Sequence, residues 1–135
     1  MQNQLPEDIA AAFAGVPSGP RKTLLAMRRL IFSVAADNEG VGTVVESLKW
    51  GQPSYHTVRP KSGSPIRLGL SKDLRPALFC HCQTSLVAEF RDQFGQDFDF
   101  EGNRALVLKG YEVRADSPLH HCLTRALTYH ASNRR

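Results

Sequence analysis

The sequence has no long run of hydrophobic residues. Its 135 residues are 41% hydrophobic and 22% charged, which is ordinary for a globular domain, and its apolar runs fall far short of the roughly 20 residues that a membrane helix needs. The N-terminal segment lacks the basic start and apolar core of a signal peptide, and has Glu7 and Asp8 instead. No repeat, low-complexity tract or long linker divides the chain. We therefore predict a single cytoplasmic domain over residues 1–135, large enough to bury its own core.

The motifs of several large enzyme classes are also missing. The sequence has no G-x-x-x-x-G-K-[ST] phosphate loop, no G-x-G-x-x-G fingerprint, no G-x-S-x-G nucleophile elbow and no H-E-x-x-H helix. No nucleophile can be paired with a general base from the sequence. We therefore expect a protein without catalytic activity and without a dedicated cofactor loop.

Cysteine is scarce and lacks the usual metal-site spacing. The three cysteines are Cys80, Cys82 and Cys122, and an odd number in a chain expected in the cytoplasm favours free thiols. Structural zinc sites normally space their cysteines as C-x₂₋₄-C, whereas one residue separates Cys80 from Cys82. A Cys/His metal site that includes His81 is the alternative, but we interpret the cysteines as core residues beside an exposed histidine.

Positive charge is present in only moderate excess. The chain has 17 Lys and Arg against 13 Asp and Glu, a net charge of +4, and it lacks the interleaved basic and aromatic residues of nucleic-acid-binding strands. We expect neither a nucleic-acid partner nor a membrane partner. Arg21, Lys22, Arg28 and Arg29 share one face of a predicted helix, and we interpret them as a solvated surface rather than an anion site.

The spacing of hydrophobic residues changes along the chain. A spacing of three to four residues predicts helices, and alternation predicts strands. The predicted elements are, in order, a short helix over Glu7 to Gly15, a long helix over Pro20 to Asp37, strands over Pro53 to Val58, Pro65 to Ser71 and Pro76 to Gln83, a helix over Ser85 to Phe94, a hairpin around Glu101 to Arg104, and a last helix capped by Asp116 or Ser117. This order predicts an α+β fold, with helices packed on one face of a mostly antiparallel sheet. The other face is open to a ligand or partner.

Acidic residues gather around one predicted strand. Asp97, Asp99 and Glu101 alternate with Phe98 and Phe100, so in a strand the three carboxylates would share one face. Carboxylate oxygens are ligands for hard divalent cations. We interpret the three carboxylates as the solvent face of an amphipathic strand, with a weak site for iron or another divalent metal as the alternative.

The segment ESLKWGQPSYHT, Glu46 to Thr57, is the least generic part of the sequence. It holds Glu46, the only tryptophan, Trp50, a Gly-x-Pro turn and Tyr55. A carboxylate, an indole and a phenol gathered at one sheet edge would form a small-ligand pocket. Trp and Tyr are also common core anchors, and for this segment taken alone the residues favour the structural interpretation.

The same segment carries a family resemblance. The run E-S-L-K-W-G-Q-P-S-Y resembles the Glu-x-x-x-Trp-Gly-x-Pro-x-Tyr signature of the YdhG-like family of small bacterial domains of unknown function. The order of elements, the histidine in PALFCHCQTSL and the Glu-Gly-Asn turn of the late hairpin agree with it, over roughly residues 20–127.

The resemblance implies a frataxin-like fold, because one family member is described as a frataxin-like iron chaperone, and it implies iron as a possible cofactor. Frataxins present iron on an acidic ridge along their first helix and the neighbouring strand, but here the long early helix carries basic residues. Only the late acidic strand could take the place of that ridge. The signature residues carry over as family features without an established role.

Two functional hypotheses follow. The first is a small-ligand or protein-interaction module. Its candidate binding residues are Glu46, Trp50, Tyr55 and His81. The alternative is a frataxin-like chaperone that carries iron or another divalent metal on surface carboxylates. Its candidate metal ligands are Asp97, Asp99 and Glu101.

Overall fold

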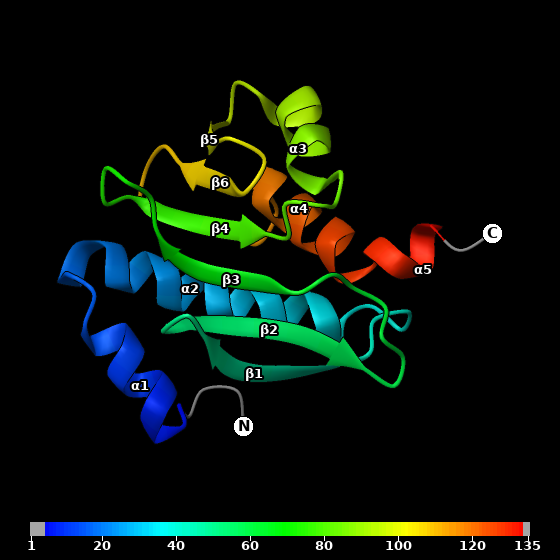
Figure 1. Ribbon diagram of the computed structural model, residues 1–135, viewed down its shortest axis with the longest axis horizontal. Coiled ribbons are helices and arrows are strands. Elements are labelled where there is room, and N and C mark those ends of the chain that lie inside the picture. The colour runs from blue at the N-terminus through cyan, green and yellow to red at the C-terminus, as the bar shows by residue number, and fades with distance from the viewer. Residues whose placement is uncertain (1–4, 134–135) are drawn as a thin grey trace.

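The structure, a computed structural model, describes residues 5–133 and confirms the α+β class (Figure 1). Its helices are α1 (Glu7–Ala14), α2 (Ser18–Ala36), α3 (Leu86–Phe94), α4 (Pro118–Leu127) and α5 (Tyr129–Asn133). Its strands are β1 (Thr43–Lys49), β2 (Gln52–Val58), β3 (Ile66–Leu70), β4 (Pro76–Cys80), β5 (Phe98–Glu101) and β6 (Ala105–Leu108). Within the described residues, no helix combines the length and hydrophobicity that a membrane span requires.

The six strands form one sheet in the order β1-β2-β3-β4-β6-β5, and every neighbouring pair is antiparallel. Tight turns join β1 to β2 and β5 to β6, while α3 carries the chain from β4 to the far edge of the sheet (Figure 1). The strands β1 and β5 are therefore the two edges.

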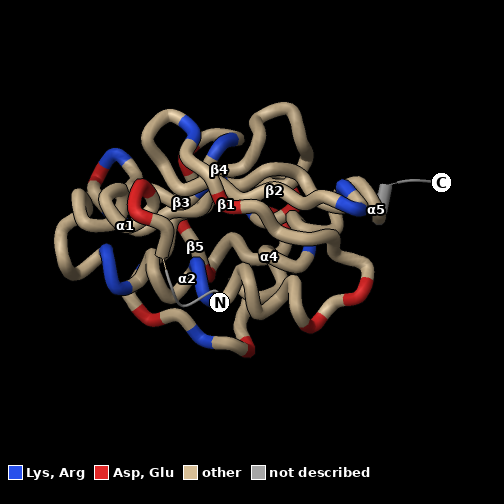
Figure 2. Tube along the Cα trace, turned by 90° about the horizontal axis from the view of Figure 1, so that it is seen from below, with Lys and Arg blue, Asp and Glu red and all other residues tan. Residues whose placement is uncertain are grey.

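Alternate residues along the strands separate the two faces of the sheet. Register pairs Leu68 with Leu78 and Leu78 with Leu106, and these leucines belong to one buried cluster with residues of α1, α2, α3 and α4. In Figure 2 both α2 and α4 lie on the same side of the strands. The intervening residues form a second, small cluster on the opposite face, made of Ala77, Phe79, Ala105 and Val107.

Most predicted elements are found close to their predicted limits, but the strand β1 and the short helix α5 were not predicted. The strand β1 was not predicted, because its residues are mostly half-buried at a sheet edge and show no clean alternation. The last helix is capped by Ser117, whose Oγ accepts a hydrogen bond from the His120 amide (3.4 Å). It ends at Leu127, and the separate helix α5 follows.

The predicted basic surface of α2 is only partly correct. Lys22 and Arg29 are exposed, and Arg21 is half-buried with its guanidinium donating to the carbonyls of Val16 and Ala14. Arg28 is 3% exposed and lies in the core. The helix therefore directs one of its four cations toward the sheet.

Candidate functional site

The ESLKWGQPSYHT segment forms the β1–β2 hairpin, with Lys49 opposite Gln52. The two residues between them, Trp50 and Gly51, both have positive φ angles, of 56° and 75°, as expected for the two-residue turns that match the twist of a hairpin. Since neighbouring residues of a strand point to opposite faces, the hairpin divides its side chains between the two faces of the sheet.

The helix-covered face receives Glu46 and Tyr55, which are paired in register. Arg28 donates to both carboxylate oxygens of Glu46, from Nε to Oε2 at 2.6 Å and from Nη2 to Oε1 at 2.9 Å. The Tyr55 hydroxyl donates to Oε2 at 2.8 Å. The side chains of Arg28 and Glu46 are only 4% and 8% exposed, so this is a buried, mutually neutralised ion pair.

Burial and the adjacent Glu46 charge raise the pKa of Tyr55 far above its usual value, so its hydroxyl stays protonated and acts as a donor. The Tyr55 ring also packs edge-on against Phe32, with centroids 6.0 Å apart. The carboxylate of Glu46 already accepts three hydrogen bonds. The geometry therefore places Glu46 and Tyr55 in the attachment of α2 to the sheet, and does not bring them together with Trp50.

The open face of the sheet carries a pocket of about 400 Å³ beneath the β1–β2 turn. Its lining includes Lys49, Trp50, His56, Lys61, Arg67 and His81. Trp50 is 89% exposed. Two of the four predicted binding residues, Trp50 and His81, thus meet in one pocket, although 31 positions separate them in the sequence.

Several elements position these side chains. The strand β1 ends with Lys49, the β1–β2 turn supplies Trp50, and β2 supplies His56. In register, Ser54 of β2 lies opposite Arg67 of β3, so both point to the open face, and Ser54 adds a nearly buried hydroxyl to the lining. The chain after β4 supplies His81.

The loop over residues 59–65, which carries Lys61, is fastened to the C-terminal end of α4. Ser62 Oγ donates to the Leu127 carbonyl (2.8 Å) and accepts from the Gly42 amide (3.1 Å). The Ser64 amide donates to the carbonyl of Ala126 (3.0 Å). These contacts fix the loop that brings Lys61 to the pocket.

Among residues 5–133, three cations and no carboxylate line the pocket. Lys49, Lys61 and Arg67 contribute the positive charges, and among residues 5–133 none of the three takes part in an ion pair. The Nη1 atom of Arg67 donates to the neutral amide oxygen of Gln52 at 2.6 Å. The pocket therefore concentrates positive charge that the surrounding side chains leave unbalanced.

Arg67 is the most constrained of the three cations. Its guanidinium lies 5.4 Å from the centroid of the Phe79 ring, and the guanidinium of Arg104 lies 5.6 Å from the same centroid. Burial, and after it the charge of Arg104, lower the pKa of Arg67. Both causes disfavour its charged form, and a bound anion would offset them.

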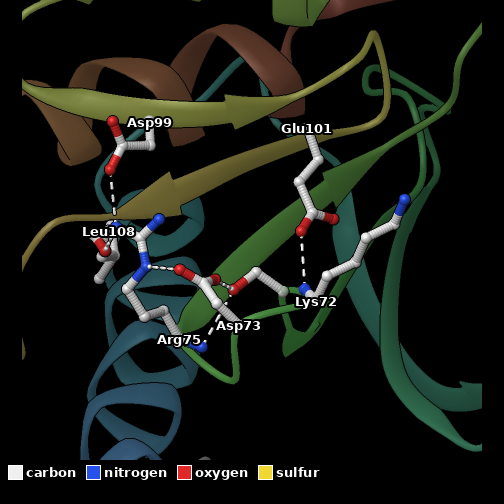
Figure 3. A network of polar contacts seen from close by, with 7 residues as sticks. Lys72, Asp73, Arg75, Asp99, Glu101 and Leu108 are labelled. Carbon is white, nitrogen blue, oxygen red and sulfur yellow. Dashed lines mark hydrogen bonds and ion pairs between the residues drawn. The ribbon is translucent and has the colours of Figure 1, made fainter.

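The predicted metal ligands are not gathered into a site. Asp99 Oδ2 accepts from Arg75 Nη1 (2.6 Å), and Glu101 Oε2 accepts from the Lys72 amide (2.6 Å), as Figure 3 shows. Asp97 lies in the turn before β5 begins, so strand alternation does not extend to it. Among residues 5–133, no group of three or more His, Cys, Asp or Glu side chains is placed to hold a metal ion.

The three thiols are free. Cys80 and Cys122 are buried, in agreement with their interpretation as core residues, while Cys82 is exposed. Burial raises the pKa of Cys80 to about 12. Cys80 is among the residues that line the pocket, but it lies opposite Ile66 in register and belongs to the helix-covered core, and its protonated thiol is a weak nucleophile and a weak metal ligand at neutral pH.

Comparisons with protein-family models, with curated proteins and with solved structures found no match. The resemblance to the YdhG-like family therefore stays a prediction.

The cationic part of the pocket was not predicted from the sequence. Strand alternation could have placed His56 and Arg67 together, because each points away from the face that holds Tyr55 and Ile66. Nothing local to Lys61 indicates that its loop closes over the same face. The sequence therefore contained the information that places His56 and Arg67 on one face, but not the information that brings Lys61 to it.

Proposed function

We propose that this protein binds a small anionic ligand in the pocket on its open sheet face and carries out no reaction on it. The observation that carries the proposal is the set of three cations, Lys49, Lys61 and Arg67, in a pocket without a carboxylate. A cytoplasmic location and membership of the YdhG-like family remain part of the proposal, supported by the sequence pattern alone.

The size and charge of the pocket suit such a ligand. Small-molecule sites span roughly 300–1,000 Å³, and this pocket has about 400 Å³. Opposite unit charges about 4 Å apart attract by about 4 kcal/mol at an effective dielectric constant of 20, before the cost of desolvation. Several cations acting together offset that cost better than one, so a multiply charged anion is favoured.

The same residues favour binding over catalysis. Cys80 is among the lining residues, but it lies opposite Ile66 in register and belongs to the helix-covered core, and burial raises the pKa of its thiol to about 12, so the thiol is held protonated. The iron-chaperone alternative receives less support, because positive charge in the pocket repels cations and the carboxylates of Asp99 and Glu101 have other partners.

The test is calorimetric titration of the protein with pyrophosphate and citrate at low and moderate salt. We expect saturable one-to-one binding that weakens as salt screens the charges. Lys61→Gln and Arg67→Gln should each weaken binding about tenfold or more. The matched control is Arg29→Gln, which removes an exposed cation from α2 and should leave the affinity unchanged.

Two results would overturn the proposal. One is the absence of saturable binding for either anion at millimolar concentration and low salt. The other is equal weakening by Lys61→Gln and Arg29→Gln, which would mean that anions respond to the net charge and not to the pocket.

A further inference from the structure

The turn residue Trp50 occupies a costly position. A positive φ at a non-glycine residue costs roughly 1–2 kcal/mol, and turns of this kind favour Asn, Asp or Gly. The indole recovers little of that cost by burial, because Trp50 is 89% exposed. Folding alone does not explain a tryptophan here.

The exposed indole belongs to the cationic pocket. Trp50 lines it together with Lys61 and Arg67, so one hollow presents an aromatic face and several charged donors. Aromatic side chains in such positions stack on flat rings, and Lys and Arg bind the oxygens of phosphate groups. A ligand that uses both features has a planar ring and an anionic group.

We propose that the ligand is a molecule of mononucleotide size that consists of a planar aromatic ring carrying a phosphate group. This inference rests on the proposed function. The ring stacks on Trp50, and Lys61 and Arg67 hold the phosphate. Phosphate is favoured over a single carboxylate because it carries up to two negative charges and three acceptor oxygens, which three cations can engage together.

The surrounding face limits the ligand to about one nucleotide. Toward β5 the open face presents Asp99 and Glu101, which lie opposite Val107 and Ala105 in register, and acidic side chains repel a phosphate backbone. In the view of Figure 2, basic and acidic positions of the described residues are interspersed along the trace. A nucleic-acid strand is therefore a poor fit.

The experiment uses calorimetry with five probes: AMP, phenyl phosphate, ribose 5-phosphate, adenosine and pyrophosphate. We expect AMP and phenyl phosphate each to bind at least about tenfold more tightly than ribose 5-phosphate, and AMP to bind more tightly than adenosine. Because Trp50 is the only tryptophan, excitation at 295 nm reports on it directly. Both aromatic phosphates should change its emission with the same midpoint as the calorimetric titration.

The variants separate the ring from the phosphate. Trp50→Asn, which suits the turn, should weaken AMP binding about 5- to 100-fold and leave ribose 5-phosphate unchanged. Trp50→Phe should keep part of the preference for AMP. Arg67→Gln should weaken both. The matched control is Tyr111→Ala, since Tyr111 is an aromatic residue 57% exposed and outside the pocket lining.

Each remaining outcome counts against the proposal in a different way. If ribose 5-phosphate and pyrophosphate bind as tightly as AMP, the ring requirement is wrong while anion binding stands. If citrate binds but no phosphate compound does, the phosphate requirement is wrong while anion binding stands; if neither binds, the proposed function fails with it. If a ten-nucleotide single strand binds far more tightly than AMP and protects Trp50, the ligand is nucleic acid and the small-molecule proposal is wrong.

Discussion

At the scale of single residues, Glu46 and Arg28 balance each other's charge inside the protein. Removing one partner of a buried pair leaves the other charge without compensation, which costs more than the pair itself contributes. We therefore expect Glu46→Ala to lower the free energy of unfolding by about 3–5 kcal/mol, measured by urea denaturation at pH 7.

The control for this variant is Glu39→Ala, which removes an exposed carboxylate and should change stability little. The folded fraction of Glu46→Ala should bind pyrophosphate as the unmodified protein does, because Glu46 lies on the opposite face from the pocket. A loss of stability below about 1 kcal/mol would show that water or another group compensates Arg28.

At the scale of elements, the β1–β2 turn trades stability for an exposed indole. Replacing Trp50 by Asn relieves the unfavourable positive φ without losing buried area, so we expect the free energy of unfolding to rise by up to about 1 kcal/mol. Leu74→Asn provides the comparison, because Leu74 also has a positive φ, of 65°, and is 61% exposed.

Both turn variants should therefore stabilise the protein in urea denaturation, and only Trp50→Asn should weaken AMP binding. Equal loss of AMP affinity in the two variants would separate the indole from the ligand. A loss of stability in Trp50→Asn would mean that the indole supports the hairpin.

The loop over residues 59–65 depends on a close approach at Gly63. A Cβ atom at this position would lie 2.7 Å from the Leu127 Cα and 2.8 Å from the Ala126 oxygen, and these are backbone atoms that cannot turn away. Gly63→Ala should lower the free energy of unfolding by about 1–3 kcal/mol and weaken pyrophosphate binding by displacing Lys61.

Gly110→Ala is the matched control, because a Cβ atom there would meet nothing within 4 Å. Thermal denaturation and calorimetry should leave it close to the unmodified protein. Unchanged pyrophosphate affinity in a destabilised Gly63→Ala protein would show that Lys61 does not depend on the loop contacts.

At the scale of the whole molecule, three buried, weakly acidic side chains in three different elements should make the protein less stable at high pH. Burial raises the pKa of Tyr55 in β2, of Cys80 in β4 to about 12, and of Cys122 in α4. The folded protein holds these protons more tightly than the unfolded chain does. Their contribution is complete below the unfolded pKa values, about 8.5 for Cys and 10 for Tyr, and is lost as pH rises above them.

The free energy of unfolding should accordingly fall from about pH 9 upward. The slope approaches 1.4 kcal/mol per pH unit for each group that is ionised only in the unfolded chain. Urea denaturation between pH 8 and 11 in the presence of a reductant measures it, and Tyr55→Phe should reduce the slope above about pH 10. A flat profile would contradict the burial of all three groups.

Features that depend on contacts between residues close in the sequence could be predicted, and features that depend on contacts between distant residues could not. Residues such as Leu24 and Ile31 of α2, or Ile66 and Leu68 of β3, have a local periodicity that fixes helix or strand and the buried face. The same periodicity misplaced Arg28, because its partner Glu46 is 18 residues away on a strand that was not predicted.

The metal hypothesis shows the same limit. The prediction that Asp97, Asp99 and Glu101 share one face required a strand that includes all three, but β5 begins at Phe98. Asp99 accepts a hydrogen bond from Arg75, and Glu101 accepts one from the Lys72 amide. Neither the strand boundary nor these distant partners is encoded in the local pattern.

The sequence by itself determined the α+β class, most of the elements and the buried side of each, since these follow from hydrophobic spacing within a few residues. Only the tertiary structure decided that Glu46 and Tyr55 join Arg28 in the core while Trp50, Lys61, Arg67 and His81 meet on the open face. The physical reason is that strand register and loop closure bring together residues far apart in the chain, and their energies depend on contacts that no local segment contains.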